Sequence, residues 1–410
     1  MSMQIKPILA ALRQHKAGTV LIALQIALTL AIVCNALFII QQRLAHLSEP
    51  TGIDEANLLV IANQWAGHRS SQEVGAQIQA DLAALRQLPS VRDASPSDGY
   101  PLSGGNWDNF VMRTPEQLKP TTDASVYMGD EHMLDTLGVK LIAGRNFNAS
   151  EIMRMASRQV VIPPVVIVTK ALADHLYPDG SALGKPIYSM STTPSTIIGI
   201  VERLQRQNVS NWSKPYAYES LLWPIREDTD GLFYIVRSKP GQLADAMREV
   251  PRALYAQSRM RVFDPKSGGS FAQIRQRAYD SDRGIAILMG IISVVLLAIT
   301  AAGIVGLTSF WVGQRRKQIG VRRALGATRS DILHYFLTEN LLISVGGVLT
   351  GTVLAIGINL WMVTRFEMAR LSMDYVGTGV ILLLLLGQCA VLGPALRASH
   401  VSPVEATRSV

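Results

Sequence analysis

The sequence predicts a membrane protein with four transmembrane helices and one large extracytoplasmic α/β domain. Three observations lead to this fold class: four long apolar stretches, a low share of charged residues, and positive charge gathered between those stretches. Only 17% of the 410 residues are charged, the mean hydropathy is +0.21, and the net charge is +8. Soluble domains carry roughly 25% charged residues, so this composition argues against a wholly cytosolic protein.

Each of the four apolar stretches is long enough to cross a bilayer as a helix. They occupy residues 18–40, 284–312, 332–363 and 375–396. A hydrocarbon core of ~30 Å requires about 20 helical residues. The first stretch exceeds the ~7–15 apolar residues of a signal peptide and no A-x-A site follows it, so we expect a retained anchor.

The distribution of positive charge predicts the orientation of these spans. Residues 1–17 carry a net charge of +3, residues 313–331 carry +5, and residues 397–410 carry +1, whereas residues 41–283 sum to zero. The positive-inside rule therefore places the first three segments in the cytoplasm, and the 41–283 domain and the short 364–374 loop outside. Because topology accounts for the basic excess, we expect the lipid bilayer and no nucleic acid as a partner.

The outer domain alternates between strand and helix patterns. A capping box, Ser70-x-x-Glu73, predicts the start of a helix whose apolar residues follow at spacings of three and four. Pro251 should interrupt or end a later helix. The proline-free segment from Ala272 to Trp311 reads as nearly uninterrupted helix. Further strands are expected at 57–63, 165–168, 197–201 and 233–237, and a short helix at 170–177.

No catalytic, metal or cofactor motif is present in the sequence. The histidines His46, His68, His132 and His175 are scattered, and we interpret the acidic cluster around His132 as solvated polarity. Cys34 and Cys389 fall inside spans and are interpreted as packing residues. The segment GSALGKP at 180–186 is one residue too short for a phosphate loop and has proline at the hydroxyl position. We therefore expect no ATP site and no enzymatic activity in this chain.

Glu339 is the one carboxylate that clearly falls within a predicted span. Ionisable groups inside a membrane are candidates for function by default. Glu339, however, lies eight residues after Asp331, close to the cytoplasmic boundary. We interpret it as a structural intramembrane carboxylate, paired with a basic loop residue or bonded to a neighbouring helix, in preference to a proton or substrate site.

The cytoplasmic loop between the second and third spans mixes basic and apolar residues. Residues 314–333 read QRRKQIGVRRALGATRSDIL. This pattern predicts a short amphipathic helix lying across the cytoplasmic face. Such a helix is either a membrane-surface segment or a docking helix for a cytosolic subunit.

The same loop carries a family resemblance. Residues 315–327, RRKQIGVRRALGA, followed by FLTE at 336–339 and the glycine pair at 346–347, closely resemble the FtsX/MacB permease family. The common form of that motif is R-x-x-E-I-G-x-x-[RK]-A-L-G-A, and Gln318 stands here in place of its glutamate. The motif G-R-x-F at 144–147 and the pattern at 168–201 also resemble that family, which implies a periplasmic core domain of MacB type.

The resemblance implies a dimeric permease of a MacB-like (type VII) ABC transporter. In that family, ATP-driven closure of cytosolic subunits is transmitted to the outer domain. Because the N-terminal cytoplasmic segment has only 17 residues, ATP and Mg are expected on a separate ATP-binding subunit. Carried over by position, residues 320–329 would form the coupling helix that contacts that subunit. Its coupling residues would be Gly320, Arg322, Arg323, Ala324, Leu325, Gly326, Ala327 and Arg329.

The leading functional hypothesis is efflux of a drug, a peptide or another periplasmic compound across the bacterial cell envelope. We expect an inner-membrane permease working with a second permease (the same chain or a sister chain), a periplasmic adaptor and an outer-membrane channel. Two alternatives come from the same resemblance: FtsX-like activation of periplasmic hydrolases and LolC/LolE-like extraction of lipoproteins. A membrane-anchored periplasmic enzyme is disfavoured by the missing catalytic motif.

Overall fold

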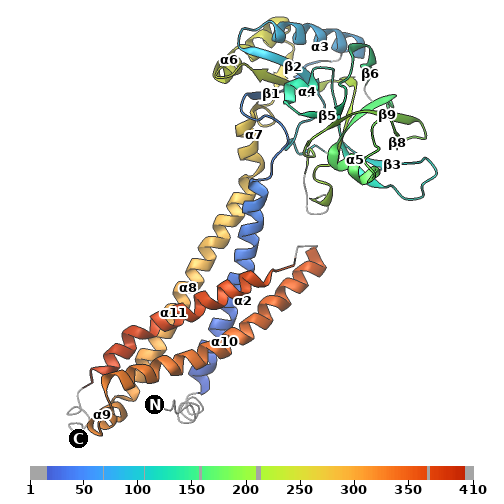
Figure 1. Cartoon of the computed structure of the whole chain (residues 1–410). Helices are drawn as coiled ribbons and strands as arrows, with labels where there is room; N and C mark the ends of the chain where they lie inside the picture. Colours follow the sequence, from blue (N-terminus) through green and yellow to red (C-terminus); the bar gives the residue numbers. More distant parts are fainter. Residues whose placement is uncertain are drawn as a thin grey trace. The chain divides into compact units, whose positions relative to one another are not determined.

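The computed structural model describes residues 16–67, 69–105, 107–156, 159–208, 214–366 and 370–401 (Figure 1). It divides into a membrane unit, Met1–Ser48 with Ser281–Val410, and an outer unit, Glu49–Asp280. Most of the predicted N-terminal segment 1–17, most of the predicted tail 397–410, and His68 lie outside the described residues.

Four helices of the membrane unit have the length and apolarity to cross a bilayer. They are α2 (Lys16–Leu47), α8 (Asp280–Gln314), α10 (Arg329–Phe366) and α11 (Met373–Ser399). Together with the mixed strands and helices of the outer unit, they confirm the predicted fold class. The helices extend past the apolar stretches because backbone hydrogen bonding continues into the polar residues at either end.

The centre of the membrane unit is α2, which packs closely on α10. Ala27 and Leu30 of α2 are fully buried. Two glycines one turn apart allow the approach: a Cβ on Gly347 or Gly351 would lie 2.8 Å from the carbonyl oxygen of Ala23 or Ala27. Small residues at such crossings let two backbones come together in lipid. The glycine pair therefore permits the α2–α10 contact.

The helix α8 contacts α2 through polar groups. The hydroxyls of Thr29 and Thr300 lie 2.7 Å apart in a buried position, and the Gln25 amide donates to the carbonyl of Ile299 at 3.1 Å. Only 11% of the most apolar window of α8 is buried, against 56% for α2. The surface of α8 is therefore mostly left to lipid or to another protein.

In the outer unit, one sheet has the strand order β13-β1-β12-β2, with β14 also paired to β1. Two helices, α3 (Ser71–Arg86) and α6 (Leu243–Gln257), cover it through apolar residues such as Ile78 and Leu254. The capping box predicted at Ser70 is present. The strands are β1 (Leu58–Trp65), β2 (Val91–Ser97), β12 (Gly231–Ser238), β13 (Arg261–Phe263) and β14 (Gly269–Ser270).

The second sheet of the outer unit closes on itself. Its order is β5-β9-β7-β10-β4-β3-β8, and β8 also pairs with β9, so six of its strands form a ring around Val126, Val168 and Trp223. A ring leaves no free edge among its members. The strands are β3 (Asp108–Met112), β4 (Thr122–Met128), β5 (Leu141–Gly144), β7 (Val165–Thr169), β8 (Pro186–Ser189), β9 (Pro194–Val201) and β10 (Ser220–Trp223).

Smaller elements complete the outer unit. The helix α5 (Lys170–Leu176) follows β7 directly, and β6 (Met153–Ala156) forms a parallel pair with β11 (Ile225–Asp228). The helix α4 (Met133–Leu137) packs against β2 and β12 of the first sheet. Single turns lie at Ala149–Glu151 and Lys214–Tyr216.

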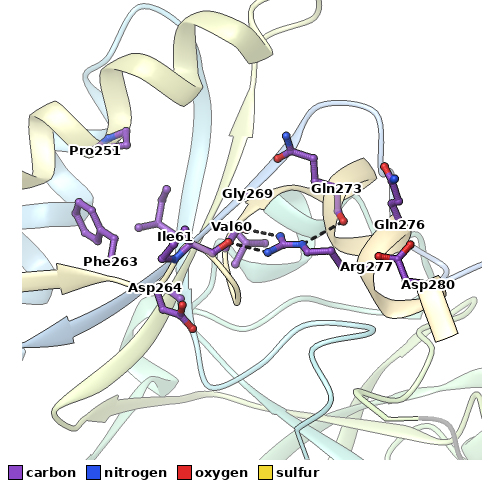
Figure 2. Close-up of a pocket in the computed structure, with 13 residues that line it drawn as sticks. Val60, Ile61, Pro251, Phe263, Asp264, Gly269, Gln273, Gln276, Arg277 and Asp280 are labelled. Carbon is purple, nitrogen blue, oxygen red and sulfur yellow. Dashed lines mark hydrogen bonds between the residues drawn. The ribbon is translucent and has the colours of Figure 1, made fainter.

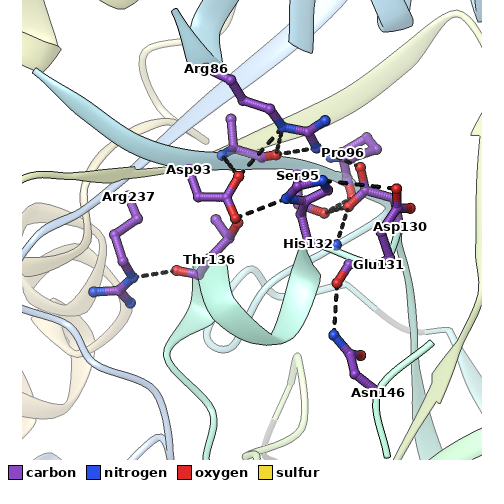
Figure 3. A network of polar contacts seen from close by, with 11 residues as sticks. Arg86, Asp93, Ser95, Pro96, Asp130, Glu131, His132, Thr136, Asn146 and Arg237 are labelled. Atoms are coloured by element: carbon purple, nitrogen blue, oxygen red, sulfur yellow. Dashed lines mark hydrogen bonds and ion pairs between the residues drawn. The ribbon is translucent and has the colours of Figure 1, made fainter. Parts of the chain in front are cut away.

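A polar network holds α4 to the first sheet (Figure 3). Asp130 accepts hydrogen bonds from Arg86 at 2.8 Å and from the Ser95 hydroxyl at 2.6 Å, and His132 lies 3.0 Å from Asp93. Asp130 is 6% exposed, so the interpretation of this cluster as solvated polarity is wrong for this residue. Its burial raises the pKa of its carboxyl, while the bonds from Ser95 and Arg86 oppose that shift.

One helix prediction for the outer unit was also wrong. The helix α6 continues through Pro251, because Val250 and Leu254 on either side of it are fully buried against the sheet. The segment from Ala272 to Trp311 is nearly uninterrupted helix, as expected: α7 (Phe271–Ala278) and α8, which begins at Asp280, are separated only by Tyr279. No proline or glycine marks that break, so composition alone did not reveal it.

Candidate functional site

The predicted coupling residues lie between α8 and α10 and do not form one helix. The helix α9 (Arg316–Ala324) ends before Gly326, whose φ of +103° is left-handed. A glycine in this conformation is a common helix terminator. Thr328 then caps α10 by exchanging hydrogen bonds with Asp331, so Arg329 already belongs to the next helix. The expectation of a continuous 320–329 helix is therefore wrong.

One face of α9 is anchored in the core of the membrane unit. Ile319 is 5% exposed and packs in the cluster that includes Trp311, Ile332 and Phe336. Gly320, the first of the predicted coupling residues, is buried next to it. This face therefore fixes α9 against the ends of α8 and α10.

An ion pair reinforces the anchor. Arg315, in the turn between α8 and α9, lies 3.0 and 3.1 Å from the two carboxylate oxygens of Glu339. The two side chains are 11% and 4% exposed. A buried pair of this kind fixes geometry, because removing one partner leaves an uncompensated charge. Glu339 thus contacts a basic residue of the loop.

Arg323 ties α9 to the end of α11. Its guanidinium donates to the carbonyls of Ser399 at 3.2 Å and Val401 at 2.7 Å. The last carbonyls of a helix have no partner within it and carry partial negative charge, so a cation is favourable there. Nearby, the guanidinium of Arg322 lies 5.1 Å from the centre of the Tyr335 ring.

The opposite face of this segment is open and combines apolar and basic side chains. Leu325 is 83% exposed and Val321 is 49% exposed. The two residues are four apart, so they neighbour each other on the surface. Among the other predicted residues, Arg322, Ala324, Gly326 and Arg329 are exposed, whereas Arg323 and Ala327 are half-buried. We call Val321, Ala324 and Leu325 with the surrounding Lys317, Arg322 and Arg329 the docking face.

Sequence reasoning missed the residues that hold the docking face in place. Arg315 and Ile319 belong to the same motif, but their roles depend on Glu339 and Phe336, which lie a helix away. Among the described residues, no group of three His, Cys, Asp or Glu side chains could hold a metal ion.

Comparison with known protein families shows which family the chain belongs to. Residues 19–253 match the MacB-like periplasmic core domain, and residues 290–403 match the FtsX-like permease C-terminal domain. The chain belongs to the FtsX/MacB permease family. It is therefore an ABC transporter permease, and the resemblance seen in its cytoplasmic loop and outer domain is confirmed. It is a membrane protein with a periplasmic-type domain.

Known relatives agree with this assignment. The chain is 26% identical over 411 residues to the macrolide export ATP-binding/permease protein MacB 1/2 of Paracoccus denitrificans, covering 97% of this chain and 57% of that protein. It is 27% identical over 299 residues to the ABC transporter permease YvrN of Bacillus subtilis, covering 69% of each. The chain spans about half the length of the MacB proteins that it matches, 57% and 49% for two of them.

Solved structures also match part of the chain, two of them from extracytoplasmic regions of transporters. The extracellular domain of the transporter YknZ from Gram-positive bacteria matches at 14% identity with a TM-score of 0.32, covering 50% of this chain and 99% of that one. The periplasmic region of MacB from Actinobacillus actinomycetemcomitans matches at 13% identity with a TM-score of 0.32, covering 56% and 96%.

Proposed function

We propose that this permease converts the ATP-driven closure of a separate cytosolic ATP-binding subunit into motion of its periplasmic domain. The motion serves efflux of a drug, a peptide or another periplasmic compound. ATP and Mg are bound and turned over by the partner subunit, and this chain supplies no catalytic group.

The observation that carries the proposal is the contrast between the two faces of the α9 segment. Its inner face is fixed by Ile319, by the Arg315–Glu339 pair and by the bonds of Arg323 to α11. Its outer face leaves Leu325 83% exposed among arginines. Val321 and Ala324 are exposed beside Leu325, so the outer face carries a small apolar patch with basic residues around it, which is the composition of a surface that binds a protein.

The contacts suggest how force enters the permease. A push on the docking face moves α9, and α9 is connected to α8 and α10 by short turns and to α11 by Arg323. The ATP-binding subunit therefore acts on the ends of three membrane helices together. At its other end, α8 follows almost directly after α7, the last helix of the outer unit.

Family membership also supports a proposal for the location and the remaining partners. We place the permease in the bacterial inner membrane, paired with a second permease that is either the same chain or a sister chain. A periplasmic adaptor and an outer-membrane channel complete the export path. Several relatives carry the name of macrolide export proteins, which supports efflux as the class of function without naming a substrate for this chain.

A substitution in the docking face tests the proposal. Leu325→Asp places a charge in the apolar contact and should uncouple ATP hydrolysis by the partner from transport, while the chain still assembles in the membrane. ATPase activity and substrate export are measured on the reconstituted complex. Leu118→Asp is the matched control, because Leu118 is a fully exposed leucine of the outer unit. Normal export by Leu325→Asp would disprove docking at this face.

Purification of the tagged permease in mild detergent, with mass spectrometry of its partners, tests the export role. An ATP-binding subunit together with a periplasmic adaptor supports efflux. A cell-wall hydrolase or a lipoprotein chaperone in place of the adaptor would contradict it and favour signalling or lipoprotein extraction.

A further inference from the structure

A pocket of about 520 Å³ opens in the outer unit, where α6 and α7 meet the edge of the first sheet (Figure 2). Pockets of roughly 300–1,000 Å³ are the size that holds a small molecule. The proposed export function assigns no residues to recognition of the exported compound, so the lining of this pocket needs an explanation.

The pocket results from a gap in the edge of the sheet. Strand β13 pairs with β1 at Asn63–Trp65, and β14 pairs with β1 at Leu59 and Val60. Ile61 and Ala62 lie between the two pairings, where the connecting loop leaves the sheet after Asp264. Both residues therefore line a hollow that a continuous edge strand would have covered.

One wall of the pocket is apolar. Ile61 of β1, Pro251 of α6 and Phe263 of β13 lie on the same side in Figure 2. Pro251 adds no side-chain polarity, and Phe263 is only half-buried, so part of its ring is available to a ligand. This wall suits an aromatic or aliphatic body.

The opposite side is polar and is formed by α7 and the start of α8. Gln276 and Arg277 are exposed residues of α7, and Asp280 is an exposed residue that follows them. The donors of Arg277 are largely occupied within the protein. Its guanidinium donates to the carbonyls of Pro265 at 2.7 Å and of Lys266, Gly268 and Gln273. Its donors point into the loop at 265–268.

The acidic groups are the charges that remain available to a ligand. Asp264 accepts hydrogen bonds from the Ser267 hydroxyl at 2.6 Å and from the Lys266 backbone N–H at 2.9 Å. These bonds hold the pKa of Asp264 below its usual range, so this carboxylate stays ionised. With Asp280, the pocket carries two carboxylates against one guanidinium whose donors are occupied.

From these walls and charges we infer that the pocket binds an apolar compound that carries a positive charge, such as a hydrophobic ammonium. This inference rests on the proposed function, in which the pocket is a recognition site for the exported compound. The apolar body lies against Phe263 and Ile61, and the cationic group lies toward Asp264, which is on the same side of the pocket in Figure 2, while Asp280 adds negative charge from the opposite side. An anionic compound of the same shape meets repulsion, and Arg277 has few donors left to hold it.

The location of the pocket connects recognition with the membrane helices. Gln276 lies on α7, which is followed after Tyr279 by α8. A bound compound therefore contacts the helix that leads directly into a membrane span. Binding at this site restricts α7 without requiring any substrate to enter the membrane.

Fluorescence polarisation of the full chain in lipid nanodiscs tests the inference, with two xanthene dyes of similar shape and opposite charge. Rhodamine 6G is the cationic probe, fluorescein is the anionic one, and empty nanodiscs give the blank. Gln276→Trp fills the pocket from an exposed helix position. The pair Asp264→Asn and Asp280→Asn removes both carboxylates, and the pair Glu116→Gln and Asp135→Asn removes two exposed carboxylates elsewhere in the outer unit.

We expect saturable binding of rhodamine 6G, weakened about tenfold by Gln276→Trp and by the double asparagine variant, and unchanged in the control pair. Fluorescein should bind about tenfold more weakly than rhodamine 6G to the unmodified chain. Thermal unfolding verifies that each variant is folded, and Asp280→Asn alone replaces the double variant if the turn at Asp264 is lost. Equal rhodamine binding by the unmodified chain and Gln276→Trp overturns the site, and equal binding of the two dyes overturns the ligand class. Because the ATP-binding subunit is absent, neither result depends on coupling.

Discussion

The outer unit and the membrane unit differ in where their ion pairs lie and in how deeply these pairs are buried. In the outer unit, Arg261 and Asp81 form an ion pair in which both side chains are fully buried, 2.9 Å apart. Tyr234 also donates to Asp81 at 2.5 Å. In the membrane unit, Arg43 near the end of α2 pairs with Asp282 at the start of α8, and Arg315, which follows α8, pairs with Glu339 about three turns into α10.

The difference indicates which part of each unit is fixed. Buried, fully bonded charges specify one arrangement of a core, and the first sheet of the outer unit is built around such a pair. In its described residues, the middle of the membrane bundle has no such charge pair. Its polar contacts between helices are neutral: Thr29 and Gln25 contact α8, and the Asn35 amide donates to the carbonyl of Ala355 on α10 at 3.2 Å. The core of the outer unit is therefore fixed by a buried charge pair, whereas the membrane bundle is fixed by charge only where Arg43 meets Asp282 and where Arg315 meets Glu339, among its described residues.

The largest expected effect comes from the buried pair of the outer unit. Asp81→Ala leaves Arg261 buried without its carboxylate and should destabilise the outer unit by ~3–5 kcal/mol. Thermal unfolding is followed by tryptophan fluorescence, since Arg261 stacks 4.3 Å from the Trp65 ring. Asp245→Ala, which breaks an exposed pair with Arg248, should cost less than about 0.5 kcal/mol. Similar losses for both variants would remove the distinction between the two kinds of pair.

The pair in the membrane unit should be the next most sensitive. Glu339→Ala leaves Arg315 largely buried without its carboxylate partner and should cost ~2–3 kcal/mol, less than Asp81→Ala because Arg315 is partly exposed. This loss of stability is measured by thermal unfolding in mild detergent. Replacing both residues, with Arg315→Met and Glu339→Leu, should restore most of the lost stability. A double variant as unstable as Glu339→Ala would show that the charge itself is required.

A pH dependence is expected in the outer unit from Asp98. Burial raises the pKa of Asp98 to about 7, and the nearby Glu227 carboxylate adds to the shift. The folded state therefore retains a proton that the unfolded chain releases near pH 4, so stability falls as pH rises from about 4 to 7 and is level above that range. Asp98→Asn should remove on the order of 2 kcal/mol of the difference in unfolding free energy between pH 5 and pH 8. An unchanged difference would contradict this, and Glu116→Gln, at an exposed carboxyl, is the control.

The smallest effect is expected at the contact between α9 and α11. Arg323→Met keeps the aliphatic stem but removes the bonds to Ser399 and Val401, at a cost of about 1–2 kcal/mol. Hydrogen exchange should become faster in the last turn of α11. Arg322→Met, which removes only the contact with the Tyr335 ring, should leave that turn unchanged. Faster exchange in both variants would indicate a general loosening of α9.

Elements with local signals were predicted well from the sequence. Ser70 and Glu73 lie three residues apart and satisfy each other, so their helix start could be recognised without tertiary information. The strand at Val165–Thr169 is a continuous apolar run, which is typical of a strand buried on both faces. The four apolar stretches likewise needed only their length.

Features that depend on distant residues were not predicted. The ring of strands requires β8 to pair with both β3 and β9, and no pattern within β8 indicates two partners. Pro251 continues a helix because the packing of its neighbours outweighs the missing hydrogen bond. The cytoplasmic motif indicated the candidate coupling residues. It did not show that Gly326 divides them between two helices, nor which of their side chains face outward.

The strand pairing of the first sheet affects how the outer unit folds during synthesis on the ribosome. Strand β1 ends at Trp65, and its partners β12, β13 and β14 begin only at Gly231. At ~5–20 residues per second, a ribosome takes roughly 10–30 s to reach those partners. During that time the apolar residues of β1 have no native neighbour strand. The nascent outer unit therefore depends on a chaperone or on slow, late collapse, and a synonymous change in translation speed across this interval should alter the yield of folded permease.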